Sequence, residues 1–161
     1  MLSIPRNECS KALVVGAGPV GLVLANECAG YGIDFRILEK NATRSTWSKA
    51  LMLTSRTMDI LENIGLNEEI LFTGTIVEGG DCYFNQKPLG SVTWDLPKTT
   101  RYPFPFINPQ PECEAAFEHV LNKRGFQVEW NSEVVGVEVQ KEYVEVSVKD
   151  SETIKARFVV G

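Results

Sequence analysis

The 161-residue sequence predicts an α/β fold that begins with two parallel strands. An apolar run at residues 11–15 is followed by a glycine-rich turn, an apolar stretch at 19–31 and a second apolar run at 33–38. Strand, helix and strand in this order are typical of a βαβ unit. Toward the C-terminus, apolar residues alternate at period two, which predicts several strands, antiparallel at the end.

The turn after the first predicted strand has the pattern Gly-x-Gly-x-x-Gly. Gly16 permits the tight turn, Gly18 lets the backbone approach a pyrophosphate, and Gly21 lets the helix pack close to the strand. Pro19 suits the first helical position because it has no amide hydrogen and its φ is already helical. The helix N-terminus then offers amides and a positive dipole end to phosphate oxygens. The pattern predicts a dinucleotide site.

An acidic residue ends the second predicted strand. Glu39 stands at about the spacing from the glycines, roughly 20 residues, at which a carboxylate bonds ribose hydroxyls. A negative charge there disfavours a 2′-phosphate, so the predicted ligand is FAD or NAD rather than NADP. A glycine turn with a purely structural role is the alternative. The order of strand, glycines, helix, strand and acid favours the nucleotide site.

The composition indicates a globular domain with small-molecule partners. A net charge of −5 without a Lys/Arg stripe argues against a nucleic-acid partner. No apolar run reaches about 18 residues, so no membrane span is predicted. The four cysteines lack metal-ligand spacing and a Cys-x-x-Cys pair, which predicts no metal site and a reducing, cytoplasmic location.

The middle of the chain is predicted to hold two short helices and a hairpin. The first helix is capped by Thr54 or Ser55 and stopped at Gly65, and the second covers about residues 67–72. Strands at 76–85 and 89–94 are separated by a turn at 86–88. Four prolines within residues 97–109 predict an extended segment.

A helix and a set of strands complete the chain. The helix begins at Pro111 and ends before Gly125, with an apolar stripe that includes Phe117 and Leu121. Period-two alternation then predicts strands at 126–130, 135–139, 143–148 and 154–160.

With these elements in place, the sequence resembles the group A flavoprotein aromatic monooxygenases, the para-hydroxybenzoate hydroxylase and phenol hydroxylase family. The branch that acts on polyketide aromatics, in secondary metabolism, is the most similar. The resemblance rests on residues 16–22, 37–40 and 48–61, and on Pro109-Gln110 leading into Glu114 and Leu121. It implies a Rossmann-like FAD-binding domain of the para-hydroxybenzoate hydroxylase type, with a β-hairpin excursion and a C-terminal antiparallel β meander.

The resemblance also implies a set of cofactor-binding residues. The three motif glycines face the FAD pyrophosphate, Glu39 the adenosine ribose and Gln110 the ribityl side of the flavin. Gln110 could instead be a helix-capping polar residue. Lys49 stands where the family usually has arginine, and lysine cannot make the bidentate contact. The implied set is Gly16, Ala17, Gly18, Pro19, Val20, Gly21, Glu39, Lys40, Lys49 and Gln110.

The activity implied for the complete enzyme is hydroxylation of a phenolic or polyketide aromatic, with O2, bound FAD and NADPH as transient reductant. The resemblance places no catalytic acid or base within these residues. Family members continue with an Asp-Gly and a later Gly-Asp segment, so we expect this chain to be the incomplete, N-terminal part of such an enzyme. Residues 74–108 are expected to be an excursion toward the substrate domain.

Two other functions are compatible with parts of the pattern. One is a non-catalytic FAD- or nucleotide-binding fragment without activity of its own. The other is an NAD-dependent dehydrogenase, which shares the features of the first 40 residues but not the block from Lys49 to Leu61 or Gln110.

Overall fold

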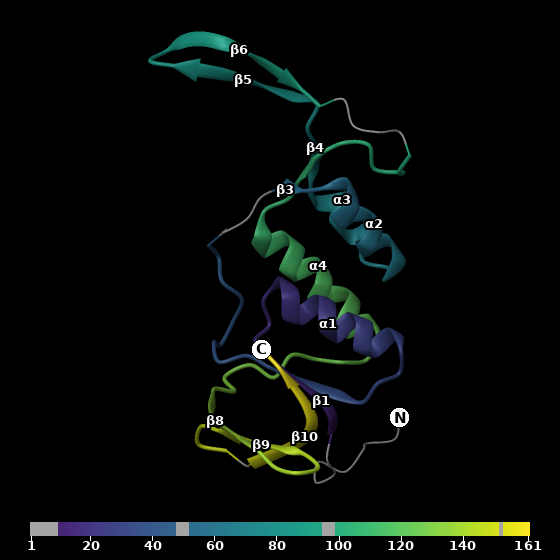
Figure 1. Cartoon of the computed structure of the whole chain (residues 1–161), viewed down its shortest axis with the longest axis vertical. Coiled ribbons are helices and arrows are strands. Elements are labelled where there is room, and N and C mark those ends of the chain that lie inside the picture. The colour runs from purple at the N-terminus through teal and green to yellow at the C-terminus, as the bar shows by residue number, and fades with distance from the viewer. Residues whose placement is uncertain (1–9, 48–51, 95–98, 152) are drawn as a thin grey trace. The chain divides into compact units, whose positions relative to one another are not determined.

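The fold is described from a computed structural model that covers residues 10–47, 52–94, 99–151 and 153–161 (Figure 1). The chain divides into two compact units. The sheet unit consists of residues up to Ser45 together with Phe117–Gly161, and the inserted unit is Thr46–Ala116. Each unit is described by itself.

The sheet unit is built on a five-stranded sheet that is part parallel and part antiparallel. Its strand order is β2 (Phe35–Leu38), β1 (Ser10–Val15), β10 (Thr153–Val160), β9 (Val144–Val148) and β8 (Val134–Val139). β1 runs parallel to both β2 and β10, whereas β10, β9 and β8 form an antiparallel meander. The predicted Rossmann-like start and antiparallel end are both confirmed.

The two faces of β1 pack against different layers. Leu13 shares a buried core with meander residues, among them Val146 and Ile154. Val14 points to the opposite face because side chains alternate along a strand. That face meets helix α1 (Pro19–Gly30), since a Cβ added at Gly21 of this helix would lie 3.3 Å from Val14 Cγ1.

A buried asparagine joins α1 to the end of helix α4 (Gln110–Lys123). Asn26 is fully buried, and its Nδ2 donates to the carbonyl oxygens of Leu22 at 2.9 Å and Phe117 at 3.0 Å. Arg124 Nη1 donates to the Asn26 carbonyl at 2.7 Å. These bonds supply polar partners inside an otherwise apolar helix contact, as a buried amide requires.

The inserted unit contains helices α2 (Ser55–Asn63) and α3 (Asn67–Thr73) and two small sheets. One sheet has the order β3 (Met52–Leu53), β7 (Phe106–Ile107) and β4 (Thr75–Ile76), and the other is the ribbon of β5 (Gly79–Phe84) and β6 (Lys87–Thr93) drawn in Figure 1. Phe106 is buried beside Gly74, where a Cβ would lie 2.2 Å from its ring.

The predicted helix stops are confirmed. Gly65 follows α2 with φ +72°, and the amide of Leu66 donates to the Leu61 carbonyl at 2.8 Å. Gly125 ends α4 in the same left-handed conformation. Glycine tolerates this conformation because it has no Cβ.

Three predicted elements differ from the structure. The strand expected at 76–85 is divided between β4 and β5, which belong to different sheets. The hairpin turn is Asn85–Gln86, both with positive φ, so Pro88 lies within β6 beside an irregularity in the register. A two-residue turn of this kind matches the twist of the strands. Residues 126–130 form no strand and only Glu129 bridges to Leu38. The alternation there reflects packing, such as Phe126 stacked on Phe35 at 4.6 Å between ring centroids.

Within the part of the chain that the structure covers, no helix has the length and apolar character that crossing a bilayer demands. Over the same residues, no three His, Cys, Asp or Glu side chains gather as metal ligands would. Cys28 and Cys113 are buried thiols, and Cys82 is an exposed one.

Replacing Asn26 with alanine should lower the free energy of unfolding by roughly 1–3 kcal/mol, because the buried Phe117 carbonyl loses its donor and Arg124 Nη1 loses its 3.2 Å bond to Asn26 Oδ1, although its bond to the backbone carbonyl remains. Asn122, exposed on α4, is the matched control, and its change to alanine should alter stability by less than about 0.5 kcal/mol. Urea unfolding of both variants measures the difference. Equal stabilities would contradict a bridging role for Asn26.

Candidate functional site

The three glycines of the turn between β1 and α1 lack a side chain for three different reasons. Gly16 has φ +102°, a conformation that side chains rarely adopt. A Cβ at Gly21 would lie 2.0 Å from the Gly16 carbonyl oxygen, so the lack of a side chain there serves the packing of the helix against the turn. A Cβ at Gly18 would meet no atom within 4 Å among the residues that the structure describes, apart from its chain neighbours. Backbone at Gly18 is therefore open to a close approach from outside.

The N-terminus of α1 carries no side-chain cap. Gly18 occupies the N-cap position, Pro19 follows as the first helical residue, and the described residues make no side-chain cap hydrogen bond there. Val20, in the same turn, is 82% exposed. Uncapped amides and the positive end of the helix dipole form a site that suits an anion.

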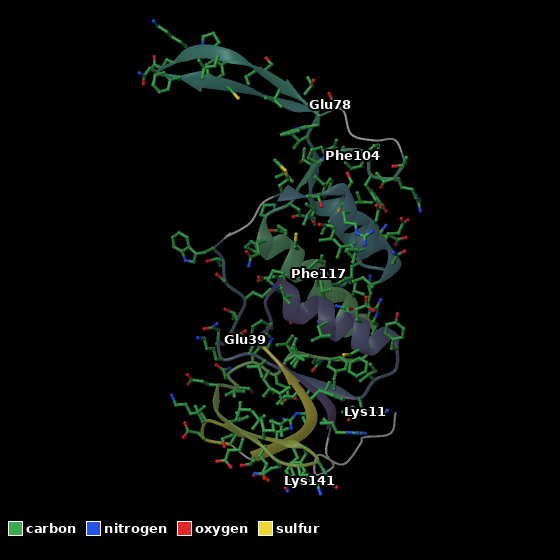
Figure 2. All side chains as sticks on the ribbon, viewed as in Figure 1. Lys11, Glu39, Glu78, Phe104, Phe117 and Lys141 are labelled. Atoms are coloured by element: carbon green, nitrogen blue, oxygen red, sulfur yellow. The ribbon has the colours of Figure 1, made fainter. Side chains whose placement is uncertain are left out.

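Glu39 lies directly after β2 and is tied to the glycine turn (Figure 2). Its Oε2 accepts a hydrogen bond from the amide of Ala17 at 2.9 Å. Its Oε1 accepts from the backbone amide of Asn41 at 3.0 Å and from Asn41 Nδ2 at 2.6 Å. The carboxylate is thus held beside the turn, with Oε2 bonded to Ala17 and Oε1 bonded to Asn41.

These contacts set the charge of Glu39. Partial burial alone would raise the pKa of its carboxyl group, but the hydrogen bonds from Ala17 and Asn41 and the nearby Lys40 ammonium outweigh it. The net effect is a pKa below the ordinary range of glutamate. Glu39 is therefore an anionic acceptor at neutral pH.

The segment at residues 129–132, after α4, hydrogen-bonds to the backbone of Glu39. The Glu39 amide donates to the Glu129 carbonyl at 2.9 Å, and the Ser132 amide donates to the Glu39 carbonyl at 2.8 Å. Arg36 makes a two-pronged pair with the Glu129 carboxylate at 2.8 and 2.7 Å. Sequence reasoning missed both Asn41 and this segment. Arg36 and Glu129 are 93 residues apart, so no local pattern predicts their pairing. For Asn41, the local signal was a polar residue two positions after Glu39.

The predicted site residues fall into three groups. The six residues from Gly16 to Gly21 and Glu39 lie together in the sheet unit, with the Ala17–Glu39 bond between them, and the exposed Lys40 adjoins Glu39. Gln110 belongs to the inserted unit, where its Nε2 donates to Glu114 Oε1 at 2.7 Å. Lys49 lies outside the described residues.

The geometry of the sheet-unit group defines its chemistry. Helix amides and open backbone at Gly18 can accommodate phosphate oxygens, and an anionic carboxylate at the end of the neighbouring strand can accept from hydroxyl groups. Phosphate and a diol lie side by side in a nucleoside diphosphate. The arrangement therefore suits the ADP half of a dinucleotide.

Comparison with known proteins agrees with this assignment. The profile of a protein family described as "FAD binding domain" matches residues 9–161, nearly the whole chain.

Two named relatives and one solved structure that are similar to this chain are monooxygenases. Pentachlorophenol 4-monooxygenase of Sphingobium chlorophenolicum is 29% identical over 154 residues, which cover 92% of this chain and 29% of the relative. Anhydrotetracycline monooxygenase of Streptomyces rimosus is 29% identical over 152 residues, with the same two coverages. The crystal structure of p-nitrophenol 4-monooxygenase from Pseudomonas putida superposes with a TM-score of 0.85 at 24% identity, over 94% of this chain and 40% of that one. The chain thus spans 29% of the length of each of these two relatives.

The depressed pKa of Glu39 predicts a pH-dependent contribution to stability. A carboxyl group whose pKa is lower in the folded than in the unfolded chain stabilises the fold above the unfolded value, about 4.3. This stabilisation is lost as the pH falls through the lower, folded value. Titration of the Glu39 carboxyl carbon by NMR should therefore give a midpoint below about 4.3. A midpoint at or above that value would show that the Ala17 and Asn41 bonds do not form in solution.

Proposed function

Because the chain belongs to the family of FAD binding domains, we propose that it is the FAD-binding portion of a flavoprotein monooxygenase. The proposed reaction is hydroxylation of a phenolic or polyketide aromatic, with NADPH as reductant and O2 as oxidant. The observation that carries the FAD site is the open backbone at Gly18 beside an anionic carboxylate held on Ala17. The names of the relatives support the reaction class.

The residues present fit FAD. The N-terminus of α1, with Gly18 and Pro19, would hold the pyrophosphate, and Glu39 would accept from the adenosine ribose hydroxyls. Bound FAD would supply the redox chemistry with O2, while the protein supplies binding, orientation and electrostatics. Gly21 contributes indirectly, because it lets the helix seat against the turn. Lys40, next to Glu39, favours its ionised form.

Two further residues are assigned by resemblance. We propose that Gln110 contacts the ribityl side of the flavin and that Lys49 contacts the flavin or its reductant. Lysine offers a compact charge in place of the planar fork of arginine, so we expect weaker orientation of an anionic partner at position 49.

We also propose that residues 74–108 form an excursion toward the substrate domain of the complete enzyme. The β5–β6 ribbon exposes large apolar side chains, with Tyr83 at 63%, Phe84 at 65% and Leu89 at 71%. A two-stranded ribbon alone is only marginally stable in water, and such exposed apolar side chains favour burial against another surface.

We propose a cytoplasmic location, which the free thiols of Cys28, Cys82 and Cys113 support.

A non-catalytic nucleotide-binding fragment is the second candidate. It is favoured by the group around Gly18 and Glu39, which suits the ADP half of a dinucleotide and needs no catalytic residue. Titration of the chain with FAD, ADP and NAD, followed by NADPH oxidation with and without added phenols, separates the candidates. FAD binding with phenol-stimulated NADPH oxidation supports the enzyme, and FAD binding alone supports the fragment. Stronger binding of NAD than of FAD would contradict both and favour a dehydrogenase.

Replacing Gly18 with alanine should weaken FAD binding by roughly tenfold or more, because the methyl group occupies the space of the pyrophosphate. The protein itself accommodates this Cβ without contact. Gly30, at the other end of α1, is the matched control: its Cβ also meets nothing within 4 Å. Fluorescence titration with FAD compares the two variants. If both bind FAD as the wild type does, the pyrophosphate is not at Gly18.

Replacing Glu39 with alanine should weaken FAD binding by on the order of 1–3 kcal/mol, the range for loss of charged hydrogen bonds. The change should also reduce discrimination against a 2′-phosphate, because the repelling charge is gone. Glu138, exposed on β8, loses the same charge in a control variant that should bind normally. Binding of FAD, ADP and 2′-phospho-ADP measures both effects. An unchanged FAD affinity would refute the ribose contact.

A further inference from the structure

Asn41 occupies one oxygen of the Glu39 carboxylate. Its backbone amide donates to Glu39 Oε1 at 3.0 Å, and its side-chain Nδ2 donates to the same oxygen at 2.6 Å. Oε2 accepts from the Ala17 amide at 2.9 Å. A carboxylate has about four lone-pair sites, shared equally by its two oxygens. Within the described residues, Oε1 is therefore fully used, and Oε2 keeps one site for a ligand.

A ribose diol needs more acceptors than Glu39 has left. The adenosine ribose of the proposed ligand carries two neighbouring hydroxyl groups, and Glu39 can accept from one of them while Asn41 keeps both of its bonds. A hydroxyl that leaves water without a new partner weakens binding. The second hydroxyl therefore requires another acceptor close to Glu39.

The side chain of Asn41 can supply this acceptor. A carboxylate accepts hydrogen bonds and donates none, so the Asn41 nitrogen must face Glu39. This leaves Oδ1, on the same carbon, as an acceptor beside the carboxylate. Asn41 is exposed, and among the described residues no group donates to its Oδ1. The pKa of Glu39, lowered in part by the Asn41 bonds, agrees with an ionised partner.

The backbone of Asn41 is fixed from the other side. The Asn131 amide donates to the Asn41 carbonyl at 3.0 Å, and the Ser132 amide donates to the Glu39 carbonyl at 2.8 Å. Asn131 has φ +57°, a left-handed conformation that asparagine tolerates better than most residues. The acceptor on Asn41 is thus placed before a ligand arrives, which favours affinity.

We propose that Asn41 is a second ribose-binding residue, whose Oδ1 accepts from one hydroxyl of the adenosine ribose while Glu39 Oε2 accepts from the other. This inference rests on the proposed function, because it takes the ADP half of a dinucleotide to lie at Gly18 and Glu39. It divides recognition of the diol between a charged and a neutral acceptor. Each hydroxyl then has a partner of its own.

The first test uses the ligand-free chain. The Asn41 side-chain NH2 signals are assigned in NMR spectra by their loss in Asn41→Ala. In the wild type we expect one of the two protons to be shifted downfield. The shift should disappear in Glu39→Ala and persist in Glu138→Ala, which removes an exposed acid from β8. Asn41 signals equal to those of the exposed Asn122 would overturn the proposal, because Glu39 would then not orient the amide.

The second test is calorimetric titration with ADP, 2′-deoxy-ADP and 3′-deoxy-ADP. Asn41→Ala should weaken ADP binding about threefold to tenfold, the effect of one lost hydrogen bond. It should weaken binding of one deoxy nucleotide by the same factor and leave the other unchanged, because that ligand lacks the hydroxyl that Asn41 binds. Asn122→Ala, the matched control, should bind all three ligands as the wild type does.

Equal losses for all three ligands in Asn41→Ala, or no loss for ADP, would overturn the proposal. If circular dichroism shows that this variant is unfolded, Asn41→Ser replaces it, because the shorter side chain stays polar but places no oxygen where Oδ1 lies. If the wild type binds neither ADP nor FAD, the proposed function fails together with this inference. If the wild type binds both and Asn41→Ala binds ADP equally well, the failure is confined to the role of Asn41.

Discussion

The hydrogen bond from the Ala17 amide to the Glu39 carboxylate links the two halves of the βαβ unit at the end where a ligand would bind. Ala17 belongs to the turn that starts α1, and Glu39 ends β2. The bond therefore fixes the turn relative to the neighbouring strand before any ligand arrives. Groups already held in their binding geometry lose less conformational freedom on association, which favours affinity.

The glycine motif serves the fold and the ligand with different members. Gly21 is required by the protein itself, since its Cβ would collide with the Gly16 carbonyl oxygen. Gly18 is not, because a Cβ there would meet no atom of the described residues within 4 Å apart from its chain neighbours. A sequence motif that looks uniform thus combines a packing constraint with a recognition constraint. The two constraints differ only in what surrounds each glycine in the fold.

Much of the sheet unit could be predicted because its signals are local. The glycines, Pro19 and Glu39 stand at fixed spacings along one βαβ unit, and Gly125 marks a helix end by its own conformation. Long-range contacts could not be predicted in this way. From the sequence, Asn26 is an ordinary polar helix residue. Only the structure shows that its side chain bonds to Phe117, 91 positions later. The alternation at 126–130 was misleading because burial on one side can arise from packing without a hydrogen-bonded ladder.

Strand β10 belongs to two pairings at once, and they meet at one residue. Ala156 is paired with Val144 in the antiparallel meander and with Ser10 in the parallel sheet. One inserted or deleted residue in this strand would turn the following side chains to the opposite face of the sheet. It would also put the strand out of register with one of its two partner strands. The β5–β6 ribbon has no such second partner within the described residues. Variation in chain length during evolution should therefore accumulate at the tip of the ribbon and be almost absent from β10.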